Sequence, residues 1–512
     1  MPVSYATPGV YVEEVDKGSK PIEAAGASMA AFVGITAEAS FKTVDPETGA
    51  RIPVESALNK ATLVTNWTQY QNIFGGFTSG AFTPDAVYGY FSNGGGPCYI
   101  TSVMALNELD SAKATAASVA IPSASGKGKG LTVTAKQVGV GGNDYSVTIK
   151  ADEKGETFSM TVGTETKSGL TMKKGDGFAG DAEFEAVSLS DLGTTVPADG
   201  SYQLSGGGTP LPSAADFIGD VVKRTGLAGL EALDDLRLVL CPDLMMGYDG
   251  SADFKDKIKA VQTAMIGDCE RLKYRFAVLD TPPGLNAQQA KEWRMWVNFD
   301  SSYAAMYYPW ISVADLSDSP QTTKMMPPSG HMVGVYNRVD GEVGFHKAPA
   351  NEVVAGALDL ELNLTKGEQG VLNPIGVNCI RSFPGRGIRV WGARTLSSDG
   401  SWRYINVRRL FIVVGASLDT GLQWVVFEPN DRTLWAKVRR DINAFLSTVW
   451  LSGALFGSSK GEAFYVKCDD ELNPPEIRDL GQLIVEIGMA PVKPAEFVIV
   501  RLSQWAGPNA EG

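Results

Sequence analysis

Histidine is almost absent from this chain of 512 residues, which has only His331 and His346. Two histidines exclude a histidine-rich metal site and argue against a site of two histidines and a carboxylate. The five cysteines stand singly, without a CxxC pair, so neither a zinc site nor a disulfide framework is predicted. We therefore expect reduced, mostly buried thiols, no metal and no cofactor.

Long apolar runs and a positive net charge are also missing. No run approaches the roughly 18–20 residues of a membrane helix, and the first residues lack the basic and apolar regions of a secretory signal. The formal net charge of −13 argues against nucleic acid as the main partner. We expect a cytoplasmic protein that does not insert into a membrane and that leaves the cell, if at all, by a route such as lysis.

Arginine is missing between Arg51 and Arg224, and tryptophan between Trp67 and Trp293. Inside this span, residues 105–212 are rich in Gly, Ser, Thr and Lys and carry short alternating runs separated by glycine turns. Such runs are typical of β-hairpins. The sequence therefore predicts a β-rich surface domain inserted at 105–212.

The flanking segments, 21–104 and 213–345, have the sequence pattern of a single α/β domain. Short, continuous apolar runs are typical of strands that are buried on both faces of a parallel sheet. Helical spacing predicts helices at about 253–272 and 286–297 between such runs. The runs are Ala31–Ile35, Cys98–Val103, Leu236–Leu240 and Arg275–Asp280.

The chain is rich in arginine after about residue 346, with seven arginines and one acid between Arg381 and Arg409. These arginines indicate either solvated surface and pairing with the chain's own acids or an interface with an acidic protein. Apolar runs at 410–414 and 423–427 predict two strands. An apolar stripe over 431–455 predicts a long helix.

We assign residues 346–487 to one C-terminal domain with a mixed sheet and this long helix. Asp431 is the expected N-cap of the helix. Helical spacing places Lys437, Arg439, Arg440 and Asp441 on the face opposite the apolar stripe.

One enzyme pattern occurs in the chain. Gly457–Gly461 matches GxSxG, the nucleophile elbow of α/β-hydrolases, with Ser459 in the nucleophile position. That motif requires a preceding strand, a following helix and a downstream histidine. A helix is expected before it and both histidines lie upstream, so a loop is favoured over a hydrolase that uses Ser459.

Both ends of the chain carry apolar, β-prone segments, Tyr5–Glu14 and Pro494–Leu502. Termini are usually polar and frayed. Apolar ends need a partner strand in their own domain or in a neighbouring subunit. Internal pairing would suit a monomeric, adhesin-like surface protein, whereas donation to a neighbour would suit a polymer.

Fourteen short stretches, distributed over nearly the whole chain except 105–212, resemble the tail sheath proteins of contractile injection systems, which include myophage tails and R-type pyocins. The arginine- and tryptophan-rich C-terminal third carries the most specific of them. Thr225–Leu233 with Cys241–Leu244 resembles the bacterial injection-system sheaths more than most phage sheaths. The stretches are Pro8–Glu14, Ala31–Ile35, Leu63–Trp67, Phe74–Gly76, Tyr90–Gly95, Tyr307–Trp310, Pro327–His331, His346–Asn351, Leu372–Asn378, Phe383–Gly387, Val390–Leu396, Trp402–Arg409, Val426–Asn430 and Pro491–Phe497.

This resemblance implies a multidomain α/β and α+β protein. Its outer α/β layer, 21–104 with 213–345, would be similar to subtilisin in fold but without the catalytic triad. The insertion at 105–212 would decorate the outside, and 346–487 would form the inner domain that faces a rigid tube. Extended arms at 1–20 and 488–512 would donate strands to neighbouring subunits.

The implied function is that of a non-enzymatic subunit of a six-fold helical sheath. The sheath would contract from a metastable extended state and drive an inner tube through a target envelope. The implied partners are further copies of the chain, the inner tube protein, the baseplate and a terminator or cap protein. Assembly would take place in the cytoplasm of the producing bacterium.

We expect Val10, Tyr11 and Val12 to form the core of the N-terminal arm. We expect Phe497–Val500, which comprises Phe497, Val498, Ile499 and Val500, to form that of the C-terminal arm. The basic face of the 431–455 helix, with Lys437, Arg439 and Arg440, is the candidate contact for the tube or for a neighbouring subunit.

Overall fold

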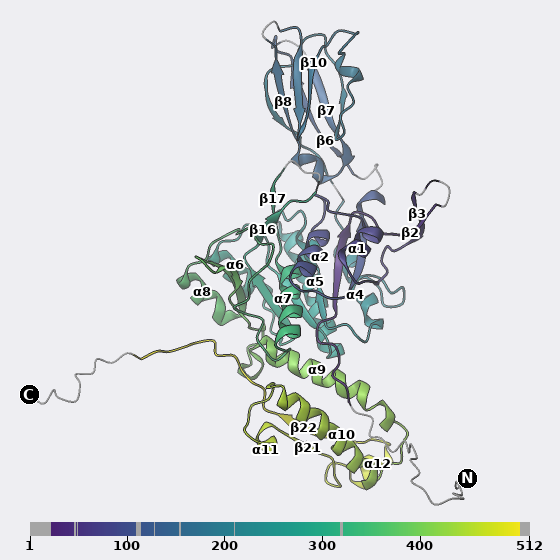
Figure 1. Cartoon of the computed structure of the whole chain (residues 1–512), viewed down its shortest axis with the longest axis vertical. Coiled ribbons are helices and arrows are strands. Elements are labelled where there is room, and N and C mark those ends of the chain that lie inside the picture. The colour runs from purple at the N-terminus through teal and green to yellow at the C-terminus, as the bar shows by residue number, and fades with distance from the viewer. Residues whose placement is uncertain are drawn as a thin grey trace, which may run out of the picture. The chain divides into compact units, whose positions relative to one another are not determined.

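The computed structural model describes residues 22–501, apart from short gaps at 46–47, 49, 109–113, 127–128, 153–154, 209 and 318–320. The chain forms two compact units (Figure 1). The larger unit comprises residues 26–412 with 493–512, and the smaller comprises 1–25 with 413–492. The predicted divide at 345/346 does not coincide with the boundary of these units.

An eight-stranded sheet is the centre of the larger unit, in the order β20-β19-β15-β14-β13-β1-β5-β4. The six inner strands are parallel, and the two outer ones are antiparallel to their neighbours. The predicted buried strands are confirmed. The strands are β1 (Ala30–Thr36), β4 (Thr62–Val64), β5 (Cys98–Ala105), β13 (Leu238–Leu240), β14 (Phe276–Asp280), β15 (Ala304–Tyr308), β19 (Val377–Phe383) and β20 (Gly387–Val390).

Helices cover both faces of this sheet (Figure 1). Alternate residues of β1 belong to different cores: Phe32 packs in the core under α1, α2 and α7, and Val33 in the core under α5 and α6. This alternation is what a strand buried on both faces requires. The helices are α1 (Trp67–Phe74), α2 (Thr83–Ser92), α5 (Ala252–Leu272), α6 (Ala287–Val297) and α7 (Ser329–Glu342).

Residues 116–203 form their own β structure with a separate apolar core. It consists of a three-stranded sheet, β11-β7-β6, and a four-stranded sheet, β10-β9-β8-β12. Buried side chains alternate with partly exposed ones along β8 and β9, as the alternating runs of the sequence predict. The strands are β6 (Ala116–Pro122), β7 (Lys129–Val138), β8 (Ser146–Ala151), β9 (Phe158–Val162), β10 (Glu165–Leu170), β11 (Val187–Ser190) and β12 (Gly200–Gln203).

Smaller elements complete the larger unit. A β2–β3 hairpin and a three-stranded β17-β16-β18 sheet lie outside the central sheet. Their bounds, with those of the short helices, are β2 (Ser40–Val44), β3 (Arg51–Ser56), β16 (Ile311–Ala314), β17 (Thr323–Met326), β18 (Asp359–Leu360), α3 (Ala214–Ile218), α4 (Gly226–Gly229) and α8 (Lys366–Leu372).

The smaller unit is built around the long helix that the sequence predicts. α10 (Arg432–Leu451) begins at Asp431, whose carboxylate accepts a hydrogen bond from the Leu434 amide at 2.8 Å. Its apolar stripe is buried from Leu434 to Val449. The other elements of this unit are α11 (Lys460–Ala463), β21 (Phe464–Lys467), α12 (Pro475–Asp479) and β22 (Glu486–Met489).

The two strands predicted at 410–414 and 423–427 are wrong. The first run lies within the helix α9 (Ile405–Gly421), and the second begins with a short 3-10 turn at Gln423–Val425. Residues 405–410 are all buried, Arg408 and Arg409 included, so the start of this helix is buried around most of its circumference. A helix of that kind cannot be distinguished from a buried strand by periodicity, and burial overrides the β preference of Ile412, Val413 and Val414.

Candidate assembly site

The C-terminal segment presents four consecutive apolar side chains to solvent. Phe497, Val498, Ile499 and Val500 are 71%, 81%, 80% and 72% exposed. Among residues 22–501, no described strand pairs with them. A run of exposed apolar side chains with unpaired backbone is a template for strand addition.

A single carboxylate fastens the start of this segment to the larger unit. Glu496 accepts hydrogen bonds from the Arg394 guanidinium at 2.9 and 2.7 Å. It also accepts one from the Asn373 amide at 2.7 Å and one from the Tyr404 hydroxyl at 3.0 Å. Burial raises the pKa of Glu496, but the hydrogen bonds from Arg394 and Asn373 outweigh it, so the pKa lies below its ordinary value. The four apolar residues therefore follow directly after a firmly held point.

The smaller unit contains a sheet of only two described strands. β21 and β22 pair antiparallel, with Phe464 opposite Met489 and Lys467 opposite Glu486. Each strand thus has an outer edge that no described strand occupies. Two strands are marginal by themselves, and β21 gains support by packing against α10.

The predicted core of the N-terminal arm, Val10 to Val12, lies outside the described residues. The chain is first described at Ile22, which is buried and packs against α9. A Cβ at Gly421 would lie 2.7 Å from the Ile22 side chain, so glycine is needed there for this contact. The Ala25 amide also donates to the Ser417 hydroxyl at 2.8 Å. The residues that follow the predicted arm are therefore fixed to α9.

The residues predicted to form the basic face of α10 differ in their exposure and in their partners. Lys437 is exposed and has no ion-pair partner among the described residues, whereas Arg439 donates to the Cys468 carbonyl. Arg440 is largely exposed and pairs with Asp441 at 3.0 Å. Asp441 itself is buried, so its predicted position on the exposed face is wrong. It lies next to Ile442 at the edge of the apolar stripe, where the Arg440 side chain neutralises it.

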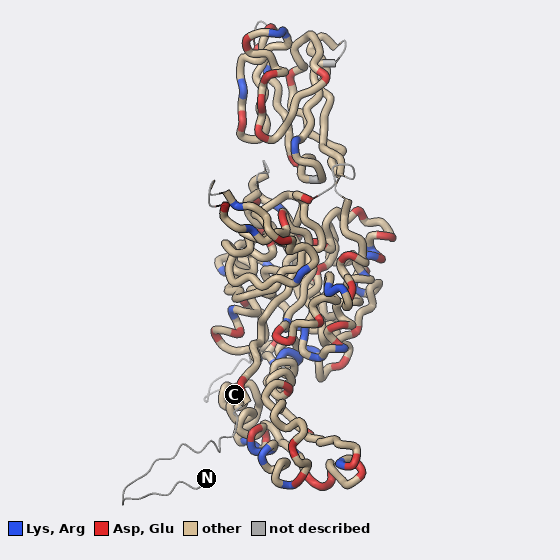
Figure 2. Tube along the Cα trace, turned by 90° about the vertical axis from the view of Figure 1, so that its right-hand side faces the viewer, with Lys and Arg blue, Asp and Glu red and all other residues tan. Residues whose placement is uncertain are grey.

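Acidic and basic residues are interspersed along the Cα trace of both units (Figure 2). α10 is thus one of several elements with basic residues, and only Lys437 and Arg440 of its three predicted contact residues extend to the surface.

Ser459 does not stand in a nucleophile elbow. The motif follows α10 instead of a strand, and Ser459 is only the residue before the four-residue helix α11. The neighbouring Ser458 donates to Glu462 at 2.9 Å. The smaller unit contains no histidine in its sequence, since His331 and His346 both belong to the larger unit.

Two buried acids lie where the parallel strands end, the usual place for a ligand in a doubly wound sheet. Asp243 accepts hydrogen bonds from the Ile35 amide at 2.6 Å and the Thr83 amide at 3.2 Å. Asp280 accepts one from the Ser329 amide at 2.9 Å. Burial raises the pKa of Asp243 to about 6 and that of Asp280 to about 7. Both carboxylates bind backbone amides of their own domain, so they connect the ends of the strands to the first residues of α2 and α7.

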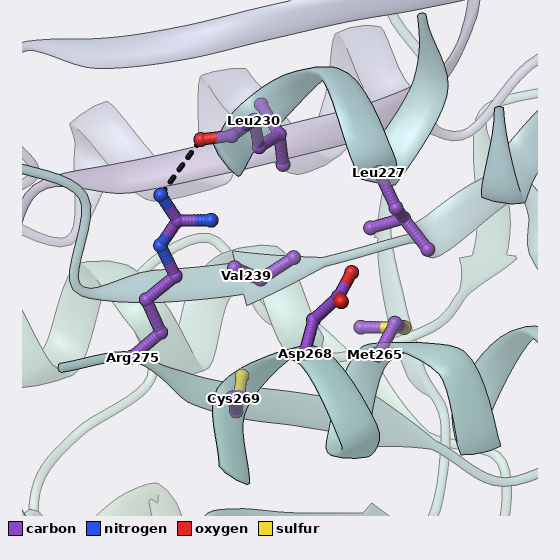
Figure 3. Close-up of a pocket in the computed structure, with 7 residues that line it drawn as sticks. All are labelled: Leu227, Leu230, Val239, Met265, Asp268, Cys269 and Arg275. Atoms are coloured by element: carbon purple, nitrogen blue, oxygen red, sulfur yellow. Dashed lines mark hydrogen bonds between the residues drawn. The ribbon is translucent and has the colours of Figure 1, made fainter. Parts of the chain in front are cut away.

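A small cavity lies between α4 and α5, lined by apolar side chains, by Cys269 and by the charged residues Asp268 and Arg275 (Figure 3). Its volume is about 10 Å³, which is the space of one water at most. Arg275 donates to the carbonyls of Leu230 and Leu233, both at 2.7 Å, and burial lowers its pKa. The cavity is therefore a packing defect beside a satisfied arginine.

Sequence reasoning missed Glu496 as an anchor, although it recognised the Pro491–Phe497 stretch. The signal in the sequence is a lone acid before four apolar residues, together with the local excess of arginines over acids between Arg381 and Arg409. No helix among the described residues has the length and apolar character needed to cross a membrane.

Comparison with known proteins gives consistent matches. The phage tail sheath protein central domain matches residues 243–396, and the phage tail sheath C-terminal domain matches 397–504. A putative prophage major tail sheath protein of Pseudomonas aeruginosa (strain UCBPP-PA14) is 29% identical over 309 residues, 58% of this chain and 75% of that protein. The tail sheath protein of Vibrio phage KVP40 is 22% identical over 328 residues, which are 58% of this chain and 46% of that protein.

Solved structures match over almost the full length. A chain of the anti-feeding prophage baseplate is 25% identical, with a TM-score of 0.58 and coverage of 98% of this chain and 99% of that one. A chain of the contracted sheath complex of the extracellular injection system PVC is 24% identical, with a TM-score of 0.59 and the same coverage. The two matched domains adjoin and together cover just over half of the chain, and the chain belongs to the phage tail sheath protein family.

Proposed function

We propose that this chain is a non-enzymatic subunit that polymerises into a six-fold helical sheath around an inner tube and contracts to drive that tube through a target envelope. The observation that carries the proposal is the exposed segment Phe497–Val500, held at its start by Glu496. A monomeric, adhesin-like protein would be expected to pair such a segment internally. No strand of the described residues pairs with the segment, which supports its donation to another chain.

The two-stranded β21–β22 sheet is the proposed acceptor. Its free edges can take a strand from a neighbouring copy on either side, and four strands would make it a stable sheet. The proposed donors are residues 1–20, with Val10, Tyr11 and Val12, and the part of the predicted 488–512 arm that follows β22, with Phe497–Val500. Head-to-tail donation of this kind leaves an open-ended assembly, as a helical tube requires.

We propose roles for the other parts of the chain from its membership of the sheath family. Residues 105–212 would form the outer decoration, 21–104 with 213–345 the outer wall, and 346–487 the inner wall. We place assembly in the cytoplasm of the producing bacterium, with release by lysis where the particle acts outside. A tube protein, a baseplate and a terminator or cap protein are the proposed partners, and contraction would use differential packing without nucleotide hydrolysis.

The test of arm donation is polymerisation of the purified full-length chain, followed by electron microscopy. The intact chain should form long hollow tubes, and deletion of residues 1–20 should leave monomers or short rings. Replacement of Phe497 and Ile499 by serine should have the same effect, with the exposed Val222→Ser as the matched control. Normal tubes from both arm variants would refute donation.

The basic residues of α10 remain the proposed contact with the tube or with a neighbouring sheath subunit. Lys437→Glu combined with Arg440→Glu should prevent co-assembly with the tube but spare empty sheaths. Arg439 is kept in that variant because its bond to the Cys468 carbonyl supports the smaller unit. Loss of empty sheaths would assign the face to a sheath neighbour, and unchanged co-assembly would remove it from both interfaces.

A further inference from the structure

An unusual phenylalanine stands at the tip of the loop between α9 and α10. Phe427 is fully exposed, at 102%, and the preceding Val426 is 59% exposed. Phe427 has a backbone φ of +67°, which a bulky side chain rarely adopts. Its backbone is therefore strained and its side chain is solvated. Both are unfavourable for a large aromatic residue in a folded domain.

The turn around Phe427 explains the strain. Val426 has φ −64° and ψ 129°, and the Glu428 amide donates to the Val425 carbonyl at 3.1 Å. These values, with the positive φ of Phe427, describe a type II turn over residues 425–428, whose third position calls for glycine. A second turn of the chain follows that rule. At Phe383–Arg386 the Arg386 amide donates to the Phe383 carbonyl, and Gly385, with φ +71°, occupies the third position.

The residues that directly follow the 425–428 turn are fixed by hydrogen bonds within the smaller unit. Asn430 donates to the Gln482 carbonyl at 2.8 Å and accepts from the Trp435 indole at 2.8 Å. Asp431 then caps α10. A fixed loop that presents a strained aromatic side chain to solvent has the properties of a preorganised anchor for a partner.

Charge indicates what the partner must present. No lysine or arginine occurs from 410 to 431, whereas Asp419, Glu428 and Asp431 are all exposed. Glu428 follows Phe427 directly and has no ion-pair partner among the described residues. A fitting surface is therefore apolar at its centre and basic beside it.

The larger unit exposes such a surface. Phe383 and Trp391 are half-buried, with ring centroids 4.5 Å apart. The Arg386 guanidinium lies over both rings, at 5.5 and 5.7 Å. Arg386 is exposed and no described carboxylate pairs with it. We call Phe383, Arg386 and Trp391 the arginine platform.

We propose that Phe427 of one copy docks on the arginine platform of a second copy, with Glu428 paired to Arg386. The inference rests on the proposed self-assembly and names one of its contacts, separate from the terminal arms. Each copy carries both halves, so the contact is head-to-tail and extends along a polymer. The strain of Phe427 is then retained because the side chain serves the assembled state.

The first test uses Phe427→Gly, which relieves the turn. The variant should melt roughly 1–3 °C higher than the unaltered chain. Its critical concentration for sheath assembly, measured by sedimentation, should nevertheless rise about tenfold or more, as expected for loss of an aromatic anchor. Assembly at the unaltered concentration would overturn the proposal. Failure of the unaltered chain to polymerise would instead refute the proposed function.

The second test reverses the charges. Glu428→Arg and Arg386→Glu should each raise the critical concentration, and the double variant should restore it because every copy then carries both exchanged halves. Circular dichroism and melting first establish that each variant folds. Single variants without effect, or a double variant that does not recover, would show that Glu428 and Arg386 do not meet between copies.

Discussion

Replacement of Glu496 by alanine tests whether one carboxylate sets the direction of the C-terminal segment. The Glu496 carboxylate satisfies Arg394 bidentately and accepts from Asn373 and Tyr404. The side chains of Arg394 and Glu496 are only 10% and 19% exposed. Alanine therefore leaves a mostly buried guanidinium without its counter-ion.

The cost follows from that geometry. Breaking a fully buried ion pair costs about 3–5 kcal/mol, and exposed pairs contribute about 0–1 kcal/mol. The residual exposure of the Glu496 pair places the expected loss at about 2–4 kcal/mol. Because the pKa of Glu496 is depressed in the folded chain, its stabilisation is present above the ordinary carboxyl pKa and is lost as pH falls through the folded value.

Hydrogen exchange measured by mass spectrometry tests whether the segment after Glu496 loses its fixed conformation. Peptides that cover 493–501 should exchange faster in Glu496→Ala. Sheath assembly should weaken because Phe497–Val500 then has no fixed orientation relative to its own unit. Glu496→Gln, which keeps an acceptor for Asn373 but not the charge, should fall in between. Glu471→Ala serves as the matched control because it breaks an exposed pair with Lys467 in the smaller unit.

If Glu496→Ala leaves both exchange over 493–501 and assembly as they are in the Glu471→Ala control, Glu496 does not orient the arm. The hydrogen bonds at Arg394 would then be incidental to the direction of the chain.

Three further outcomes follow from single side chains. Asp280→Asn keeps an acceptor for the Ser329 amide but removes a charge whose folded pKa is about 7, so it should raise stability by about 1–4 kcal/mol at pH 8 and have little effect near pH 4, as measured by denaturant unfolding at both values. Asp431→Ala removes the cap on Leu434 and should cost about 1 kcal/mol of unfolding free energy, seen as a lower urea midpoint. Ser459→Ala should change neither assembly nor any esterase or protease background; loss of measurable hydrolysis would revive the hydrolase alternative.

The sequence predicts the elements whose burial is periodic. The strands of the central sheet read as continuous apolar runs because both faces are covered, and α10 reads as a stripe because one face is. α9 gives no such stripe, because a helix that is buried around most of its circumference has no polar face to mark it. The position of Asp441 is not predictable from helical spacing, which gives an angle but not the width of the buried face.

Features that depend on long-range contacts could not be read from the sequence. The carboxylate of Glu496 meets Arg394 across 102 residues, and spacing alone does not select that arginine from its neighbours. The strain at Phe427 is not predictable from the sequence either, because Val-Val-Phe-Glu-Pro contains no glycine that would indicate a type II turn.

The exposed segment also sets a scale for how strongly one arm can hold a neighbour. Full burial of four apolar side chains contributes about 1.5–3 kcal/mol each, or about 6–12 kcal/mol for Phe497–Val500. Ordering four residues costs about 1–2 kcal/mol each for the backbone, which offsets about 4–8 kcal/mol. A single arm is therefore a link of a few kcal/mol. The stability of a sheath linked in this way must come from many such arms together, and from contacts like the one proposed for Phe427. A single arm can then dissociate while the other contacts keep the subunits together.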